Sequence, residues 1–146
     1  MSVLIIDTST DLLYLGLYCQ DKLQSWEAKP HGNQLSKFLL PSIDTLLQEH
    51  LLCLEKIDYI AIGLGPGSFT GTRIGVIVAM GLCFALDIPH VGFASSLTEN
   101  TSLLLEDIQN KFEKKIFNLE INYCSLTPDS SRIKAPEPKT SEGTVQ

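Results

Sequence analysis

The 146-residue chain is poor in several features that would assign it to a class of protein. Its four cysteines, at positions 19, 53, 83 and 124, lie far apart and form no C-x-x-C pair, which argues against a zinc site or a redox motif. Basic residues are also scarce: the chain has 11 Lys and Arg but 17 Asp and Glu, which gives a net charge of −6. Because phosphate contacts supply much of the affinity for nucleic acids, we expect RNA contact only through a partner.

Long apolar runs are missing as well. The most apolar uncharged stretch, 74–86, has 13 residues, whereas a membrane span needs about 20. Asp7 interrupts the short apolar start of the chain, so we expect no signal peptide and no membrane association. A cytoplasmic location with reduced thiols follows as an expectation, and the stretch 74–86 is predicted to be a buried helix.

The residues that are present suffice for one domain with a tail. Apolar residues make up 44% of the chain and charged residues 19%, which is enough for a hydrophobic core at this length. The segment 125–146 differs, because it holds four Ser, three Thr, three Pro and no aromatic residue. We expect this tail to be disordered.

Apolar periodicity predicts an α/β domain over residues 1–113. Short apolar runs predict strands at 3–6, 13–18, 23–28, 57–64 and 90–93, and helical spacing predicts helices at 34–50, 72–86 and from 96 onward. Pro41 should kink the first helix, and Ser96 with Glu99 fits a capping box at the start of the third. Three strands followed by alternating helices and strands indicate a mixed sheet. Alternation at 117–123 predicts one further strand within 114–124.

The glycine-rich segment 63–75 is the most unusual part of the sequence. It follows a predicted strand and opens a helix, where backbone amides and the helix dipole can hold an anion. However, it lacks the Lys of a Walker A loop, the spacing of G-x-G-x-x-G and the pattern G-x-S-x-G. A plain Gly-Pro turn remains the alternative interpretation.

Small residues recur on one face of the helix that follows. Gly71, Gly75 and Ala79 are spaced by four, and small residues let another backbone approach closely. The opposite face, with Ile77, Met80, Cys83 and Phe84, is predicted to pack on the sheet. The neighbour of the small face is then the first helix or another chain, unless the face packs wholly inside this domain.

Several motifs together resemble the bacterial TsaB family. The resemblance covers residue 1 to about residue 105 and rests on Ile5-Ile6-Asp7-Thr8-Ser9, Leu39-Leu40-Pro41, the segment 65–75, Gly81-Leu82, and Val91-Gly92 before Ser95-Ser96-Leu97. It implies an actin-like, sugar-kinase-type (ribonuclease-H-like) fold, of which this chain carries the N-terminal half. It also implies a non-catalytic subunit that pairs with the related catalytic subunit TsaD and works with the ATPase TsaE. That complex transfers a threonylcarbamoyl group to the adenosine beside the anticodon of tRNAs that read codons starting with A.

The resemblance also sets the expected sites. It implies no catalytic residue and no metal ligand in this chain, with ATP and metal held by the partner subunits and tRNA met only through the complex. Asp7, Thr8 and Ser9 form either a residual phosphate loop or a turn that ends a strand. The alternative function is an actin-like nucleotide hydrolase or kinase completed by a partner. The predicted interface, for TsaD or for a second copy, comprises Gly67, Ser68, Phe69, Thr70, Gly71, Arg73, Ile74, Gly75 and Ala79.

The chain also departs from the family pattern. Leu35 occupies the position where the family usually has a histidine. The family also continues into a second domain, of which we expect only a remnant strand at 114–124, so this chain resembles a shortened member. The family has also carried the name glycoprotease. His31, His50 and His90 are isolated in sequence and form no H-E-x-x-H motif, which argues against a metallopeptidase.

Overall fold

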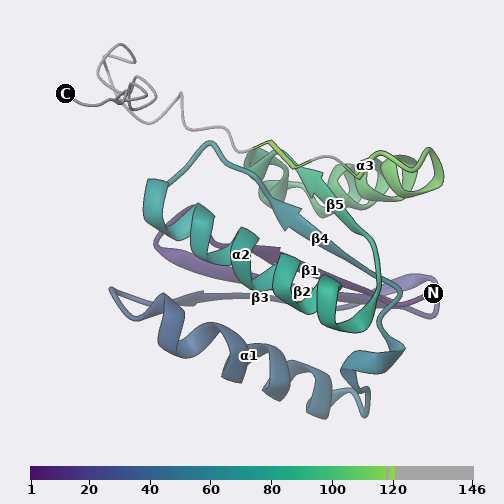
Figure 1. The fold of residues 1–146 in the computed structure, drawn as a ribbon, viewed down its shortest axis with the longest axis horizontal. Helices are drawn as coiled ribbons and strands as arrows, with labels where there is room; N and C mark the ends of the chain where they lie inside the picture. The colour runs from purple at the N-terminus through teal and green to yellow at the C-terminus, as the bar shows by residue number, and fades with distance from the viewer. Residues whose placement is uncertain (118, 121–146) are drawn as a thin grey trace, which may run out of the picture.

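The computed structural model describes residues 1–117 and 119–120 of the chain. A five-stranded mixed sheet carries helices on both faces (Figure 1). The strands are β1 (Val3–Asp7), β2 (Leu12–Cys19), β3 (Lys22–Pro30), β4 (Tyr59–Gly63) and β5 (His90–Phe93). The helices are α1 (Leu35–Glu49), α2 (Phe69–Leu86) and α3 (Thr101–Glu113), with short 3-10 helices η1 (Leu54–Lys56) and η2 (Ser95–Glu99).

The sheet has the order β3-β2-β1-β4-β5. β2 pairs antiparallel with both β1 and β3, whereas β1, β4 and β5 run parallel. The central strands β1 and β4 are buried at every position because helices cover both of their faces. Parallel strands end at the same edge of a sheet, so the loops after β1, β4 and β5 meet there. These loops carry the motifs singled out in the sequence.

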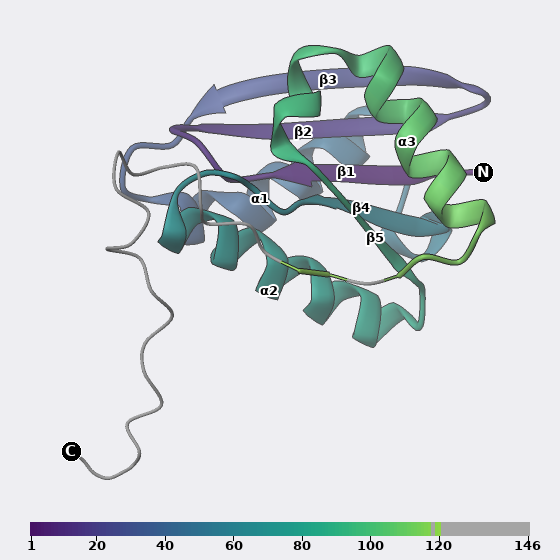
Figure 2. The ribbon, with the colours of Figure 1, turned by 90° about the horizontal axis from the view of Figure 1, so that it is seen from above.

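Two hydrophobic layers hold the helices on the sheet. On one face α1 and α2 lie side by side and pack on alternate residues of the strands, among them Leu4, Ile6 and Ile60. On the other face α3 places Leu104 and Ile108 against the opposite set. Figure 2, turned by 90°, shows α3 crossing the strands on the side away from α1 and α2.

The predicted order of strands and helices agrees with the structure in the described ranges, but the starts predicted for the second and third helices were wrong. α2 begins at Phe69 rather than near Thr72, because the Ser68 hydroxyl caps it by accepting a hydrogen bond from the amide of Gly71 at 3.1 Å. The expected capping box at 96–99 is the 3-10 helix η2, and Asn100 caps α3 instead. The helix α1 begins at Leu35, after Gln34, and has no side-chain cap.

Of the predicted strand at 114–124, the described residues are 114–117 and 119–120, and none of these is in a strand. The predicted tail at 125–146 lies outside the described residues. Within the described ranges, α2 is the one helix long and apolar enough, by length and composition, to cross a membrane. Its inner side packs on the sheet, but only 28% of the helix is buried, so the prediction of a buried helix at 74–86 was wrong for the outer side.

Candidate functional site

The loop after β1 lies at the carboxyl edge of the sheet, among the sequence motifs described above. Asp7, Thr8 and Ser9 are all buried. Asp7 Oδ1 accepts hydrogen bonds from the amide of Ser9 at 3.0 Å and from the hydroxyl of Ser95 at 3.1 Å. The Ser95 hydroxyl in turn accepts a hydrogen bond from the amide of Gly65 at 2.8 Å. One carboxylate thus ties together the loops that follow β1, β4 and β5.

Burial raises the pKa of Asp7, and the hydrogen bonds from Ser9 and Ser95 offset only part of that rise. Its second oxygen, Oδ2, has no hydrogen-bond partner within the described part of the chain. The same holds for the hydroxyls of Ser9 and Thr72. Both observations make the ionised form of Asp7 less favourable than that of an exposed carboxylate, because it is buried without a countercharge.

The glycine-rich segment packs directly on this loop. The amide of Ser68 donates to the carbonyl of Ser9 at 2.6 Å, and the Thr8 hydroxyl donates to the carbonyl of Gly71 at 2.5 Å. A Cβ atom on Gly67, Gly71 or Gly75 would lie less than 3.0 Å from atoms of Ser9 or Thr8. Glycine is therefore required at these positions because α2 starts within contact distance of the Asp7–Ser9 loop.

This packing bears on the phosphate-loop hypothesis for Asp7, Thr8 and Ser9. A phosphate cradle needs backbone amides that face an open cavity. Here the Ser9 amide already donates to Asp7, and the first turn of α2 covers the loop. The geometry favours the alternative interpretation, in which Asp7 ends a strand and stabilises a turn.

The predicted orientation of α2 was wrong. Gly71, Gly75 and Ala79 face the interior of this domain, where Ala79 is fully buried in the core with Val76 and Cys83. Of the four residues expected to face the sheet, Cys83 is buried as predicted, but the other three point outward: Ile77 is 67% exposed, Met80 45% and Phe84 90%. The physical reason is the close approach of α2 to Thr8, which only small residues permit.

The residues predicted to form the interface are therefore partly buried and partly exposed. Gly67, Gly71, Gly75 and Ala79 are buried and unavailable to a partner, and Ile74 is partly buried. Ser68, Phe69, Thr70 and Arg73 are exposed, and the Arg73 guanidinium lies 4.8 Å from the centre of the Phe69 ring.

Sequence reasoning missed Ile77, Met80 and Phe84, which continue the stripe of Phe69 and Arg73 along the helix. We call this stripe, Phe69, Arg73, Ile77, Met80 and Phe84, the outer face of α2. The sequence held a signal for it, since a helix that is apolar on every side requires apolar neighbours on two sides.

The helix α1 lies beside α2 on the same face of the sheet (Figure 1). It buries Leu35, the residue found in place of the family histidine, at the edge of the core. Phe38 and Leu40 are about half exposed. Within the described residues, no group of three or more His, Cys, Asp or Glu side chains is arranged to hold a metal ion.

Comparison with known proteins identifies the family. The family model described as TsaD, tRNA N6-adenosine threonylcarbamoyltransferase, matches residues 30–109. The tRNA threonylcarbamoyladenosine biosynthesis protein TsaB of Haemophilus influenzae is 38% identical over 96 residues, which cover 62% of this chain and 38% of that protein. The chain belongs to the TsaD family, in its TsaB group.

Further TsaB relatives extend the match. The Escherichia coli protein is 32% identical over 99 residues, covering 67% of this chain and 42% of that protein. The Buchnera aphidicola (subsp. Baizongia pistaciae) protein is 29% identical over 127 residues, covering 86% of this chain and 55% of that protein. The chain thus spans between 38% and 55% of the length of these TsaB relatives.

Solved structures confirm the actin-like α/β fold. YeaZ from Pseudomonas aeruginosa superposes with a TM-score of 0.58 at 36% identity, over 64% of this chain and 43% of that chain. A second structure, described as an uncharacterized protein with similarity to peptidase YeaZ from the same organism, gives a TM-score of 0.56 at 37% identity over the same shares.

Proposed function

We propose that the chain is a non-catalytic subunit of a complex that forms threonylcarbamoyladenosine on tRNA, and that it docks a TsaD-type catalytic subunit. The TsaB relatives, which are named for this biosynthesis, support the pathway. The outer face of α2 carries the docking proposal, because it exposes large apolar side chains in one continuous stripe. Such stripes on a soluble protein mark interaction surfaces.

The family relationship suggests how the two subunits meet. The matching model, that of TsaD itself, spans 30–109 and therefore includes α1 and α2. A TsaD-type partner then carries a corresponding pair of helices, so like faces can pack about a pseudo-twofold axis. The same geometry permits a homodimer of this chain when the partner is absent, and the two assemblies compete for one face.

The packing of α2 on the Asp7–Ser9 loop bears on which subunit binds ATP and carries out the reaction. Because α2 covers this loop, we assign ATP, metal and the transfer chemistry to the partner subunits, including a TsaE-type ATPase. The net charge of −6 gives the chain no general attraction for phosphate, so tRNA is met through the complex. We place this work in the cytoplasm.

The deciding experiment compares two exposed apolar residues. Phe84, on the outer face, is 90% exposed, and Leu51, which follows α1, is 95% exposed. Phe84→Asp should weaken binding to the TsaD-type subunit of the same cell by about 30-fold or more, as expected for an interface hot spot worth about 2 kcal/mol. Leu51→Asp introduces the same charge outside the stripe and should leave affinity within about twofold.

Calorimetry with the purified partner, run beside gel filtration of the chain alone, measures both assemblies. Phe84→Asp should also abolish any homodimer. In a reconstituted reaction with tRNA, ATP and the partner subunits, it should lower product formation in proportion to lost binding. Equal affinities for the two variants would exclude the outer face of α2 as the docking surface. ATP turnover by the chain alone would exclude the non-catalytic assignment.

A further inference from the structure

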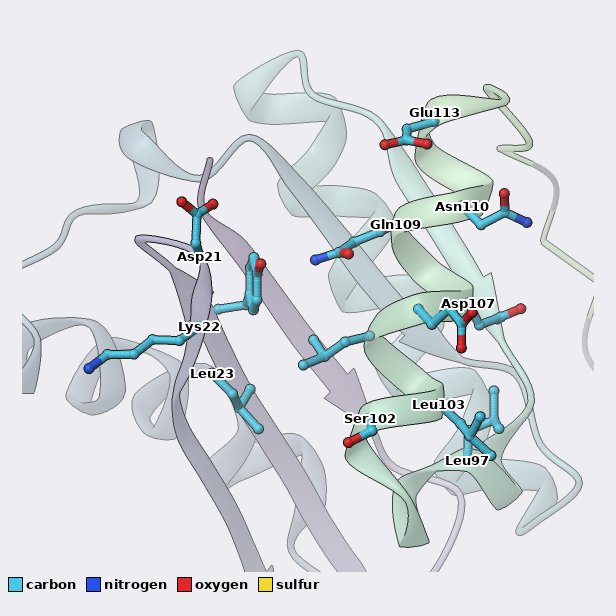
Figure 3. Close-up of a pocket in the computed structure, with 13 residues that line it drawn as sticks. Asp21, Lys22, Leu23, Leu97, Ser102, Leu103, Asp107, Gln109, Asn110 and Glu113 are labelled. Atoms are coloured by element: carbon cyan, nitrogen blue, oxygen red, sulfur yellow. The ribbon is translucent and has the colours of Figure 1, made fainter.

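A broad groove lies on the face of the sheet opposite α1 and α2. It runs between α3 and the β2–β3 hairpin and has a volume of about 1000 Å³ (Figure 3). Tyr18 and Leu23 line it from the hairpin, and Leu97 and Leu105 line it from η2 and α3. Ser102 and Gln109 point from α3 toward the hairpin. The groove therefore has apolar walls with polar groups among them.

The groove exists because α3 covers only part of this face. The buried residues of α3, Leu104 and Ile108, pack with residues of β1, β4 and β5. The hairpin strand β3 lies at the sheet edge, and its residues 23–27 are only partly buried. A half-covered sheet face with leucine and aromatic side chains retains apolar area that a partner can bury.

The charged residues that line the groove are mostly acidic. Asp21, Glu106, Asp107 and Glu113 line it, and Lys22 is the only cation among its lining residues. Figure 3 shows Lys22 directed away from α3. Asp107 is paired with Lys111 at 3.0 Å, but within the described part of the chain the other three carboxylates have no ion pair.

The excess of carboxylates limits which ligands the groove can hold. Phosphate groups are repelled by such a surface, whereas Lys and Arg side chains gain from it. Apolar walls between unpaired carboxylates match a segment that carries both kinds of side chain.

We propose that this groove binds a basic amphipathic segment of a partner protein, with its apolar side chains against Tyr18, Leu23 and Leu105 and its Lys or Arg side chains beside Glu106 and Glu113. At 1.5 Å per residue, the 13 residues of α3 offer a wall about 20 Å long, which matches between about three and four turns of a docked helix. The surface is separate from the outer face of α2, which lies on the other side of the sheet, so both can be occupied together.

The test uses the full chain and a synthetic probe, a fluorescein-labelled helical peptide of about 14 residues built from Leu and Lys at helical spacing. Two control peptides replace every Lys by Glu or every Leu by Ser. By anisotropy, the Leu/Lys peptide should bind with a Kd on the order of 10–100 μM. Binding should weaken as salt rises, because rim charges are screened. Both control peptides should bind at least about tenfold more weakly.

Matched charge reversals locate the binding. The double variant Glu106→Lys, Glu113→Lys should lose at least about fivefold in affinity. Glu49→Lys, Glu55→Lys makes the same change in net charge at exposed sites away from the groove and should stay within about twofold. All four positions are exposed, so thermal melts should show both variants folded.

Three outcomes would overturn the proposal. Equal losses of peptide affinity in the two double variants would show that the binding depends on net charge and not on the groove. Equal binding of the Leu/Lys and Lys/Ser peptides would remove the apolar contribution. Self-association of the chain that is abolished by the groove variant but not by Phe84→Asp would make a second copy the occupant. None of these measurements involves a TsaD-type subunit, so their failure leaves the proposed function untouched.

Discussion

The two sides of α2 differ in the size of their side chains and in their exposure to solvent. The inner side is lined by small residues, with Gly75 in contact with Thr8 and Ala79 fully buried. The outer side carries Ile77 and Phe84, which are larger and mostly exposed. An ordinary amphipathic helix buries its large apolar residues and exposes its small or polar ones. In α2 Val76 and Cys83 follow this rule, but the small residues Gly75 and Ala79 are buried while the large residues Ile77 and Phe84 are exposed.

This contrast shows that the close approach of α2 to the β1–β2 loop sets the orientation of the helix more than the hydrophobicity of its faces does. The hydrogen bonds from Ser68 to Ser9 and from Thr8 to Gly71 draw the first turns of the helix onto the β1–β2 loop. At that separation a side chain larger than hydrogen collides with the loop, whichever face is more apolar. The large residues are then left outside, where another protein can cover them.

The largest expected effect tests the inner side. Gly75→Leu should unfold the protein or lower its stability by more than about 3 kcal/mol, because even a Cβ collides with the Thr8 side chain. Thr8 cannot rotate away without losing its hydrogen bond to Gly71. Gly75→Ala should cost about 1–3 kcal/mol. Thermal and urea unfolding followed by circular dichroism measures both.

The matched control lies on the same helix. A Cβ on Gly81 meets nothing within 4 Å, so Gly81→Ala should raise stability by about 0.5–1 kcal/mol through helix propensity alone. If Gly75→Ala proved as harmless as Gly81→Ala, the close approach of α2 to Thr8 would be wrong, and the small face would be free for a partner.

The sequence predicted much of the fold but not this orientation. The strands β1, β4 and β5 appear as apolar runs because buried parallel strands need them, and α1 shows a helical stripe. The side that α2 presents to the sheet depends on Thr8, a residue more than 60 positions away, through a 2.5 Å hydrogen bond. Local periodicity holds no information on such a contact.

The candidate site, like the fold, could be predicted from the sequence only in part. The motif at 65–75 stands out in the sequence because of its glycines, but their contacts with Ser9 and Thr8 could not be predicted from it. Ser95 was part of a family motif, but its link to Asp7 and Gly65 depends on the loops after three strands meeting in space. Residues on the outer face of α2 were assigned to the core because large apolar side chains usually belong there.

The next largest effect tests Asp7, which supports the loop under α2. Asp7→Asn keeps an acceptor for Ser9 and Ser95, whereas Asp7→Ala leaves both donors without one. The alanine variant should therefore be less stable than the asparagine variant by about 1–3 kcal/mol. Urea unfolding at neutral pH measures the difference, and equal stabilities would show that these hydrogen bonds contribute nothing.

The pH dependence has a definite sign. Burial raises the pKa of Asp7 above the ordinary aspartate value of 3.8, so folding favours the protonated acid. This contribution is complete below pH 3.8 and is lost as the pH rises through the folded-state pKa. Subtracting the stability of the wild type from that of Asp7→Asn should give a difference that grows over this interval and is constant above it. A difference that shrinks with rising pH would mean that a cation neutralises Asp7.

A smaller effect is expected on the outer side. Ile77→Ser and Phe84→Ser should each change the stability of the isolated chain by no more than about 0.5 kcal/mol, because their side chains are mostly exposed. Val76→Ala, one residue from Ile77 but buried, should cost about 1.5 kcal/mol or more, from about 0.8 kcal/mol for each buried methylene. A large loss on Ile77→Ser would place the outer face inside the domain.

The last comparison sets Cys83, on the inner side of α2, against Cys53, which is exposed. It involves no change in stability, only in reactivity. Burial raises the pKa of the Cys83 thiol to about 11, so at pH 8 only about one molecule in a thousand carries the reactive thiolate. Iodoacetamide should therefore modify Cys53 within minutes and leave Cys83 nearly unmodified, as read by mass spectrometry of the digested protein. In urea the two should react alike, which provides the control. Comparable rates in the native protein would mean that α2 lifts off the sheet, and the contrast between its two sides would then describe only a minor state.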